Sequence, residues 1–129
     1  MMRVLSLVCT LALGVALSSA QSDRLAGPQF KFDKTVHDFG TINPGDVVNT
    51  TFQFQNEGDS PLIITNVDVT CGCTTPKYPK QPIAPGKSAD IEVGFNSKGK
   101  SGNFYKAITI HSNAPDSPTR IFIKGTISK

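Results

Sequence analysis

Apolar and polar residues alternate with a period of two along most of the chain. In the clearest stretch, Val47 to Asn56, Phe52 and Phe54 fall on one face while Gln53 and Gln55 fall on the other. Strict alternation predicts a β-strand with one side against a core and the other in water. The same reasoning predicts further strands at 30–32, 36–42, 62–69, 89–96, 104–112 and 119–128, the last with Ile121, Ile123 and Ile127 inward.

Turn signals separate these segments. Residues 43–46 (Asn-Pro-Gly-Asp) and 83–87 (Ile-Ala-Pro-Gly-Lys) place Pro before Gly, an order that suits a type II turn because Gly accepts a positive φ. Gly40 interrupts a strand and predicts a bulge or a bend between sheets. No segment keeps a 3.6-residue period. Six or seven short strands spaced by about ten residues predict an all-β fold, an immunoglobulin-like antiparallel β-sandwich of about seven strands.

The N-terminal end has the pattern of a cleaved secretory signal. Arg3 precedes an apolar run, and Ser18-Ser19-Ala20 supplies small residues before Gln21. We therefore expect a signal peptide at 1–20, a disordered leader at 21–29 and one domain at 30–129. The expected product is exported, periplasmic or secreted, and soluble after cleavage, and no later apolar run is long enough to span a membrane.

Charge gives little support to nucleic-acid binding. Loss of Arg3 with the signal leaves 12 basic residues against 10 acidic ones, dispersed and without a basic stripe. No Ser-His-acid triad or pair of carboxylates stands out, so we predict no catalytic residue, no cofactor and no enzyme activity. His37 and Asp38 are sequence neighbours, and neighbours in a strand point to opposite faces. His111 is expected at the surface.

The segment Cys71 to Ser88 is the longest irregular stretch, with four prolines. Connections of this length are usually functional or cross between sheets. It opens with Cys71-Gly72-Cys73, and once the signal that contains Cys9 is removed these are the only two cysteines.

Three interpretations of Cys71 and Cys73 remain open. In an extended strand the two thiols would share one face and pack as small hydrophobes. In an oxidising compartment they could form a disulfide, provided that the chain turns at Gly72, and so short a loop would be readily reduced and redox-active. As two thiolates they could form a soft half-site for copper or zinc, for which only His37 and His111 offer further soft ligands.

The chain resembles one bacterial family across about Phe30 to Ile127. The shared features are Phe39-Gly40, the Asn-Pro-Gly-Asp turn, the Phe-Gln-Phe-Gln-Asn strand, Thr-Cys-Gly-Cys-Thr, the Ile-Ala-Pro-Gly turn and the final Ile-Lys-Gly. They are similar to the domain-of-unknown-function family 1573, grouped with Hydin-like and PapD-like immunoglobulin folds. The resemblance implies an immunoglobulin-like sandwich in an exported bacterial protein and assigns no activity.

These observations predict a general class of function. We predict a non-catalytic module with a binding or structural role at the cell envelope, whose partner is another envelope or secreted protein and not a nucleic acid. An exposed sheet edge would accept a strand of the partner, and the loop from Cys71 to Ser88 would give specificity. The alternative is a dithiol redox or soft-metal protein that acts through Cys71 and Cys73. The sequence leaves the oligomeric state open.

Overall fold

The computed structural model describes Gly14 and residues 27–129. The expected signal peptide, apart from Gly14, and leader residues 21–26 lie outside the described part of the chain. The expected end of the leader at Gln29 needs correction. Gly27 N–H donates to Asp59 Oδ1 at 2.7 Å, Gln29 N–H donates to Asn56 Oδ1 at 3.2 Å, and Pro28 is buried. Residues 27–29 therefore belong to the domain, because they are hydrogen-bonded to it.

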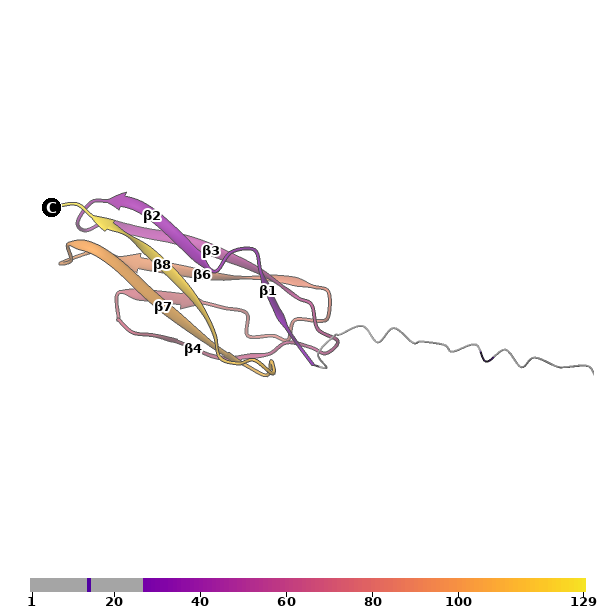
Figure 1. Ribbon diagram of the computed structural model, residues 1–129. Helices are drawn as coiled ribbons and strands as arrows, with labels where there is room; N and C mark the ends of the chain where they lie inside the picture. Colours follow the sequence, from indigo (N-terminus) through magenta and orange to yellow (C-terminus); the bar gives the residue numbers. More distant parts are fainter. Residues whose placement is uncertain (1–13, 15–26) are drawn as a thin grey trace, which may run out of the picture.

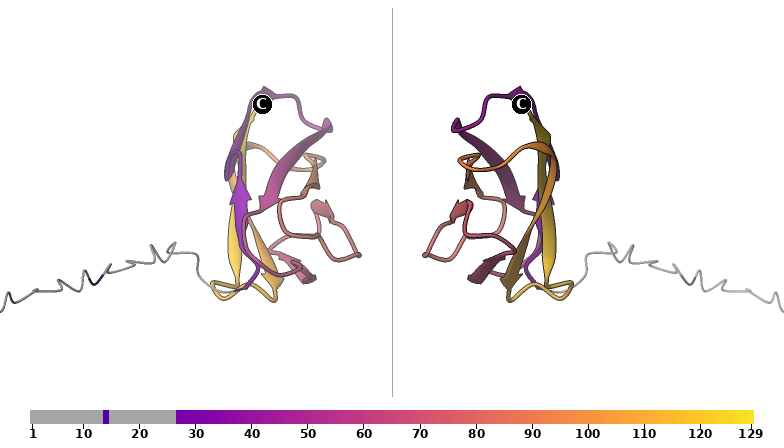
Figure 2. Two further views of the ribbon diagram at one scale, coloured as in Figure 1. Left: turned by 90° about the vertical axis from the view of Figure 1, so that its right-hand side faces the viewer. Right: turned by 90° about the vertical axis from the view of Figure 1, so that its left-hand side faces the viewer.

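The described residues form a sandwich of two four-stranded sheets and contain no helix (Figures 1 and 2). The first sheet has the order β1-β3-β6-β5 and the second β2-β8-β7-β4. The all-β immunoglobulin-like class is thus confirmed, with eight strands where about seven were expected. Their bounds are β1 Phe30–Phe32, β2 Val36–Ile42, β3 Val47–Asn56, β4 Ile64–Val69, β5 Thr74–Lys77, β6 Ser88–Asn96, β7 Gly102–Ser112 and β8 Thr119–Ile127.

The core lies between the sheets and consists of the inward faces that the alternation predicts. Phe52 and Phe54 of β3 are almost completely buried, and so are Ile121 and Ile123 of β8. The rings of Phe95 on β6 and Phe104 on β7 stack across the two sheets with centroids 4.2 Å apart. The other buried apolar residues are Ile42, Leu62, Ile64, Ile83, Ile91, Val93, Ile108, Ile110, Ala114 and Ile127.

The two Pro-Gly turns form as predicted. Asp46 N–H donates to Asn43 O at 3.0 Å, and Lys87 N–H donates to Ala84 O at the same distance. Gly45 has a φ of 89°, in the left-handed region that favours glycine. Each turn directly precedes one strand of the central β3–β6 pair, which runs from Val47 opposite Asn96 to Gln55 opposite Ser88.

Strand β2 departs from the antiparallel expectation, because it pairs in parallel with β8. The chain leaves β1 in the first sheet and crosses to the edge of the second, where it runs beside the last strand (Figure 1). The register shifts between Asp38 and Thr41, and Gly40 there has a φ of 72°. The bulge predicted at Gly40 is therefore present.

The region expected to be irregular from Cys71 to Ser88 contains a strand, β5. Its four residues pair with β6 from Thr74 opposite Phe95 to Lys77 opposite Glu92. Pro76 is tolerated because β5 is an edge strand, where a missing N–H on the open side costs no ladder hydrogen bond. The crossover from β4 in one sheet to β5 in the other consists of residues 70–73, which include the two cysteines.

Candidate functional site

The chain turns sharply at Cys71-Gly72-Cys73. Strand β4 ends at Val69, and Thr74 N–H donates to Cys71 O at 3.1 Å, which closes a turn over the two cysteines. The turn brings the Cα atoms of Cys71 and Cys73 to 5.2 Å, and a disulfide joins their sulfurs. The extended arrangement, in which both thiols continue an apolar stripe of the strand, is therefore wrong. The turn replaces it because the chain must pass from one sheet to the other within four residues.

Both cysteines are half-buried, while Gly72 between them is exposed. A Cβ built on Gly72 would meet no atom within 4 Å, so this side of the turn is open to solvent. Cys73 packs against the hydrophobic core, and its N–H donates to Cys71 Sγ at 3.1 Å. Cys73 O accepts from Asn96 N–H at 2.9 Å, which fixes the turn to the end of β6.

This disulfide adds little to the stability of the fold. Chain-entropy arguments give about 1.6 kcal/mol for closing a three-residue loop, against about 3 kcal/mol for a loop of fifteen residues. Hydrogen bonds of Cys71 O and Cys73 O already hold the turn. The structural benefit is therefore small compared with that of disulfides that link distant parts of a chain.

No group of three or more His, Cys, Asp or Glu side chains that could hold a metal ion is present among Gly14 and residues 27–129. His111 lies on β7, where Nε2 is 2.8 Å from Asp68 Oδ2, and His37 lies on β2, where Nδ1 accepts from Lys34 Nζ at 2.7 Å. The two histidines are therefore engaged with other side chains. The described structure does not bring them together with Cys71 and Cys73 as a ligand set.

The two histidines lie in different surroundings. His111 is half-exposed on the outer face of the second sheet, as expected. The pKa of His37 is lowered from 6.5, first because partial burial disfavours the charged ring, and second because Lys34 is close, while Asp38 opposes the shift. His37 also packs edge-on against Phe39, with centroids 4.6 Å apart.

The four edge strands differ in their capacity to pair with another chain. Strand β1 has three residues, β2 is bulged at Gly40, and β5 contains Pro76. Strand β4 has six residues without proline and pairs only with β7. Ile83 covers the segment before β4 through two 2.8 Å hydrogen bonds with Leu62. The register of β4 also shifts, between Ile64 and Asn66, but residues 66–69 pair regularly with β7. Among the described residues, β4 thus presents the longest regular, proline-free run on an edge strand, and its side chains Asn66 and Asp68 point to solvent.

The outer face of the second sheet carries exposed apolar side chains. The ring of Tyr105, 59% exposed, stacks on Phe122 with centroids 5.0 Å apart. Val36 of β2 is 38% exposed and lies opposite Phe122 in the register. Together, Val36, Phe122 and Tyr105 form an apolar strip across β2, β8 and β7. Exposed aromatic residues of this kind are enriched at protein interfaces.

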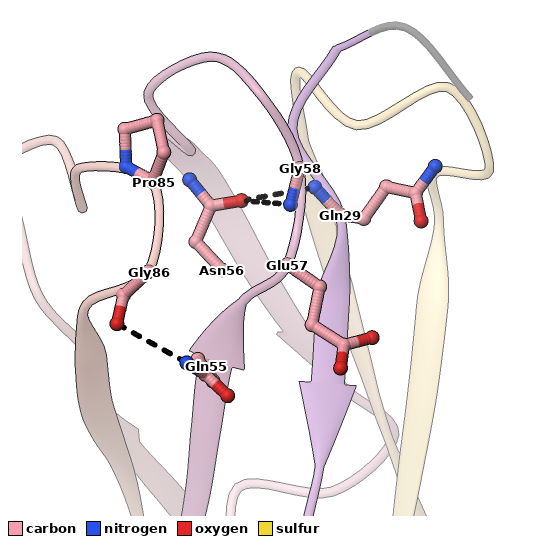
Figure 3. A pocket seen from close by; sticks show the side chains of 7 residues that line it. All are labelled: Gln29, Gln55, Asn56, Glu57, Gly58, Pro85 and Gly86. Atoms are coloured by element: carbon pink, nitrogen blue, oxygen red, sulfur yellow. Dashed lines mark hydrogen bonds between the residues drawn. The ribbon is translucent and has the colours of Figure 1, made fainter. Parts of the chain in front are cut away.

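A polar hollow of about 630 Å³ is lined by Gln29, by the end of β3 and by the turn at Pro85 and Gly86 (Figure 3). Asn56 forms its floor, and its side chain is completely buried. Its Nδ2 donates to Ser60 O at 2.8 Å and to Ile83 O at 2.9 Å, and its Oδ1 accepts from the N–H groups of Gly58 and Gln29. All four hydrogen bonds are made within the protein, so the amide serves to join three loops.

Sequence reasoning missed three buried polar residues, Asn56, Thr74 and Ser97. Ser97 Oγ lies 3.0 Å from Asn43 O and 2.8 Å from Asp46 O, which ties the β6–β7 hairpin to the first Pro-Gly turn. The available signal for Asn56 and Ser97 is positional: each lies two residues after the last inward phenylalanine of its strand, Phe54 or Phe95. A polar residue there is either solvated or caps a loop, and alternation alone does not distinguish the two.

Comparisons with known proteins identify a family but no function. Residues 30–127 match the family model described as "Protein of unknown function (DUF1573)". No curated protein matches the sequence. Among the described residues, none forms a helix that is long and apolar enough to cross a membrane.

Solved structures with a similar fold include bacterial and human proteins of different kinds. A protein of unknown function from Porphyromonas gingivalis W83 is 19% identical with a TM-score of 0.69, over 84% of this chain and 51% of that one, so the chain spans about half of its length. The seventh PapD-like domain of human CEP192 is 10% identical with a TM-score of 0.67, over 100% and 98% of the two chains. The secreted serine protease VesC from Vibrio cholerae is 17% identical with a TM-score of 0.57, over 78% of this chain and 23% of the protease. At these identities the similarity shows the fold alone.

Proposed function

Because the chain belongs to the DUF1573 family, whose function is unknown, we propose a function from the surface features of this immunoglobulin-like domain itself. The proposed function is that of an exported, non-catalytic module that binds another envelope or secreted protein. Binding occurs by strand addition at the open edge of β4. The observation that carries the proposal is this edge, which has six residues and a strand neighbour on one side only.

An added strand would find unpaired backbone groups on β4. Outward backbone N–H and C=O groups of an edge strand can pair with an extended segment of a partner, and the main chain then supplies affinity while side chains supply specificity. Asp68, held by His111, and Asn66, whose Nδ2 donates to Asp68 Oδ1 at 2.8 Å, flank the edge on the outer face. A partner strand with a basic or hydroxyl side chain at the facing position would suit this pair of oxygen acceptors.

The loop from Tyr78 to Lys87 lies beside the same region and supplies a second contact for specificity. At the start of the loop, Lys80 Nζ lies 3.6 Å from the centroid of the Tyr78 ring, so a cation and an aromatic ring are in contact there. Ile83 fixes the other part of the loop to Leu62, directly before β4. The loop is thus held to the chain two residues before the edge that the partner would use.

The non-catalytic character is part of the same proposal. Among residues 27–129, the interactions described above place no histidine beside both a nucleophile and a carboxylate. The amide of Asn56 at the floor of the polar hollow forms its hydrogen bonds within the protein. These arrangements favour recognition over turnover of a substrate.

The test begins with identification of the partner by cross-linking in the native cell, followed by hydrogen–deuterium exchange of the purified complex. We expect amide protection to rise across Ile64–Val69 on binding. The other three edges, β1, β2 and β5, serve as internal controls and should keep their exchange rates.

Protection at another edge, or only at the Tyr105 and Phe122 strip, would contradict strand addition at β4. Absence of any cross-linked partner would contradict the binding function itself. Export is tested separately by the N-terminal residue of the protein recovered from the envelope or medium, which we expect to be Gln21. Recovery of the full chain from the cytoplasm would refute it.

A further inference from the structure

Three properties of the Cys71–Cys73 disulfide affect its reactivity. It closes a loop of only three residues, it lies beside an open surface at Gly72, and one of its sulfurs already accepts a backbone hydrogen bond. The first property means that reduction removes little folding stability. The second means that a thiol of another molecule can approach.

The hydrogen bond distinguishes the two sulfurs. Cys73 N–H donates to Cys71 Sγ, and the same donor would stabilise a thiolate at Cys71 after the bond is broken. A stabilised thiolate is the better leaving group in thiol–disulfide exchange. Cys73 Sγ, by contrast, has Thr74 Oγ1 as its neighbour at 3.8 Å and packs against the core. The leaving sulfur is therefore Cys71, and the attacked sulfur is Cys73.

We propose that Cys71 and Cys73 form a redox-active pair that exchanges its disulfide with the dithiol of another protein. This goes beyond the proposed strand binding and does not depend on it. In the first step a partner thiolate attacks Cys73 Sγ, a mixed disulfide forms, the Cys71–Cys73 bond breaks, and Cys71 leaves as a thiolate.

In the second step the partner's second thiolate attacks the partner's first sulfur, which is bonded to Cys73 in the mixed disulfide. The partner's disulfide forms, and Cys73 leaves as a thiolate. The two partner thiols release their protons to solvent when they become thiolates. The thiolates of Cys71 and Cys73 take up two protons from solvent after they leave. The net change transfers two electrons and two protons, so that the partner dithiol is oxidised and the Cys71–Cys73 disulfide is reduced.

The surrounding fold allows the exchange without unfolding. Thr74 N–H on Cys71 O and Asn96 N–H on Cys73 O hold the turn independently of the sulfurs. The reduced turn therefore keeps its backbone hydrogen bonds, and the β4-to-β5 crossover stays in place. Reduction changes the chemistry of the crossover while the two sheets are preserved.

The first experiment uses the purified, folded protein and reduced glutathione without denaturant. Free thiols are counted by a maleimide mass tag, and β-structure is followed by circular dichroism. We expect two thiols to appear together at millimolar glutathione while the spectrum stays unchanged. A disulfide that yields thiols only after denaturant is added would overturn the proposal.

Access is tested at Gly72. Gly72→Phe places a large ring over the open side, where no atom lies within 4 Å of the new Cβ, so the fold should be retained. We expect reduction by a protein dithiol such as reduced thioredoxin to slow at least tenfold, while Gly72→Ala stays within twofold of the natural protein. Equal rates for the two variants would contradict attack from this side.

The assignment of the two sulfurs is tested with single-cysteine variants. Cys73→Ser retains Cys71 and the N–H of residue 73, and Cys71→Ser retains Cys73. We expect the Cys71 thiol to react with iodoacetamide at pH 7 several-fold faster than the Cys73 thiol. Faster reaction of Cys73 would overturn the assignment of Cys71 as leaving group, while reduction of the natural protein tests the exchange itself.

Discussion

Replacement of Asn56 by Ala tests the interpretation of the polar hollow as a structural junction. Asn56 has no exposed surface and makes four hydrogen bonds to three loops. Figure 3 shows the two that its Oδ1 accepts, from Gly58 and Gln29. The substitution leaves Gly58 N–H buried without this partner, at about 1–3 kcal/mol. It also removes one of the two hydrogen bonds to Ile83 O, which keeps Leu62 N–H, at about 0.5–1.5 kcal/mol. Ser60 O and Gln29 N–H are only partly buried, and water from the hollow can replace the amide there. The expected loss of unfolding free energy is about 2–4 kcal/mol.

The assay is urea unfolding followed by circular dichroism. With a slope of about 1.5 kcal/mol per molar urea, typical for a domain of this size, the midpoint should fall by roughly 2 M. Gln55→Ala is the matched control, because Gln55 is the neighbouring residue and donates only one exposed hydrogen bond, to Gly86 O at 3.2 Å. The control should change stability by less than about 0.5 kcal/mol.

A second variant, Asn56→Asp, separates the donors from the acceptor. The carboxylate keeps an oxygen for the N–H groups of Gly58 and Gln29 but has no donor for Ser60 O and Ile83 O, and it places a charge in a buried position. Its midpoint should therefore fall at least as far as that of Asn56→Ala at pH 7. If Asn56→Ala shifted the midpoint no more than Gln55→Ala, the hydrogen bonds would not be the source of stability that we infer.

Three further predictions follow from individual contacts. The pKa of His37 is lowered in the folded protein, so the unfolded chain takes up a proton first as the pH falls below about 6.5. The free energy of unfolding should therefore decline from that pH down through the lowered pKa of the folded state. Urea unfolding between pH 8 and pH 5 should show a shallower decline for His37→Gln than for the natural protein, and equal slopes would contradict the shift. Gly125→Ala brings a Cβ to 2.8 Å from the Phe104 ring and should cost roughly 1–3 kcal/mol, whereas Gly72→Ala meets open space and should be neutral; similar midpoints for both would refute this. Phe52→Ala removes a completely buried ring and should cost about 3–5 kcal/mol in the same assay, and a loss below 1 kcal/mol would show that Phe52 is not central to the core.

The sequence by itself determined the class of fold and the inward faces of the strands. Alternation placed Phe52 and Phe54 on one side of their strand, and both are buried in the core. The Pro-Gly turns were also predictable, since Pro sets one dihedral angle and Gly45 accepts the positive φ of the next. Both signals are local: each depends on the properties of a few consecutive residues, which are the same whichever strands later become neighbours.

Tertiary structure decided which strands pair and how the cysteines lie. The parallel pairing of β2 with β8 depends on packing between residues about 86 positions apart, such as Val36 and Phe122, and no local pattern records it. Strand β5 forms despite Pro76 because an edge position leaves one side of the backbone free. Cys71 and Cys73 meet because the crossover between sheets forces a turn, where local alternation equally allowed a continuous strand. The burial of Asn56 likewise exists only once three distant loops converge on its amide.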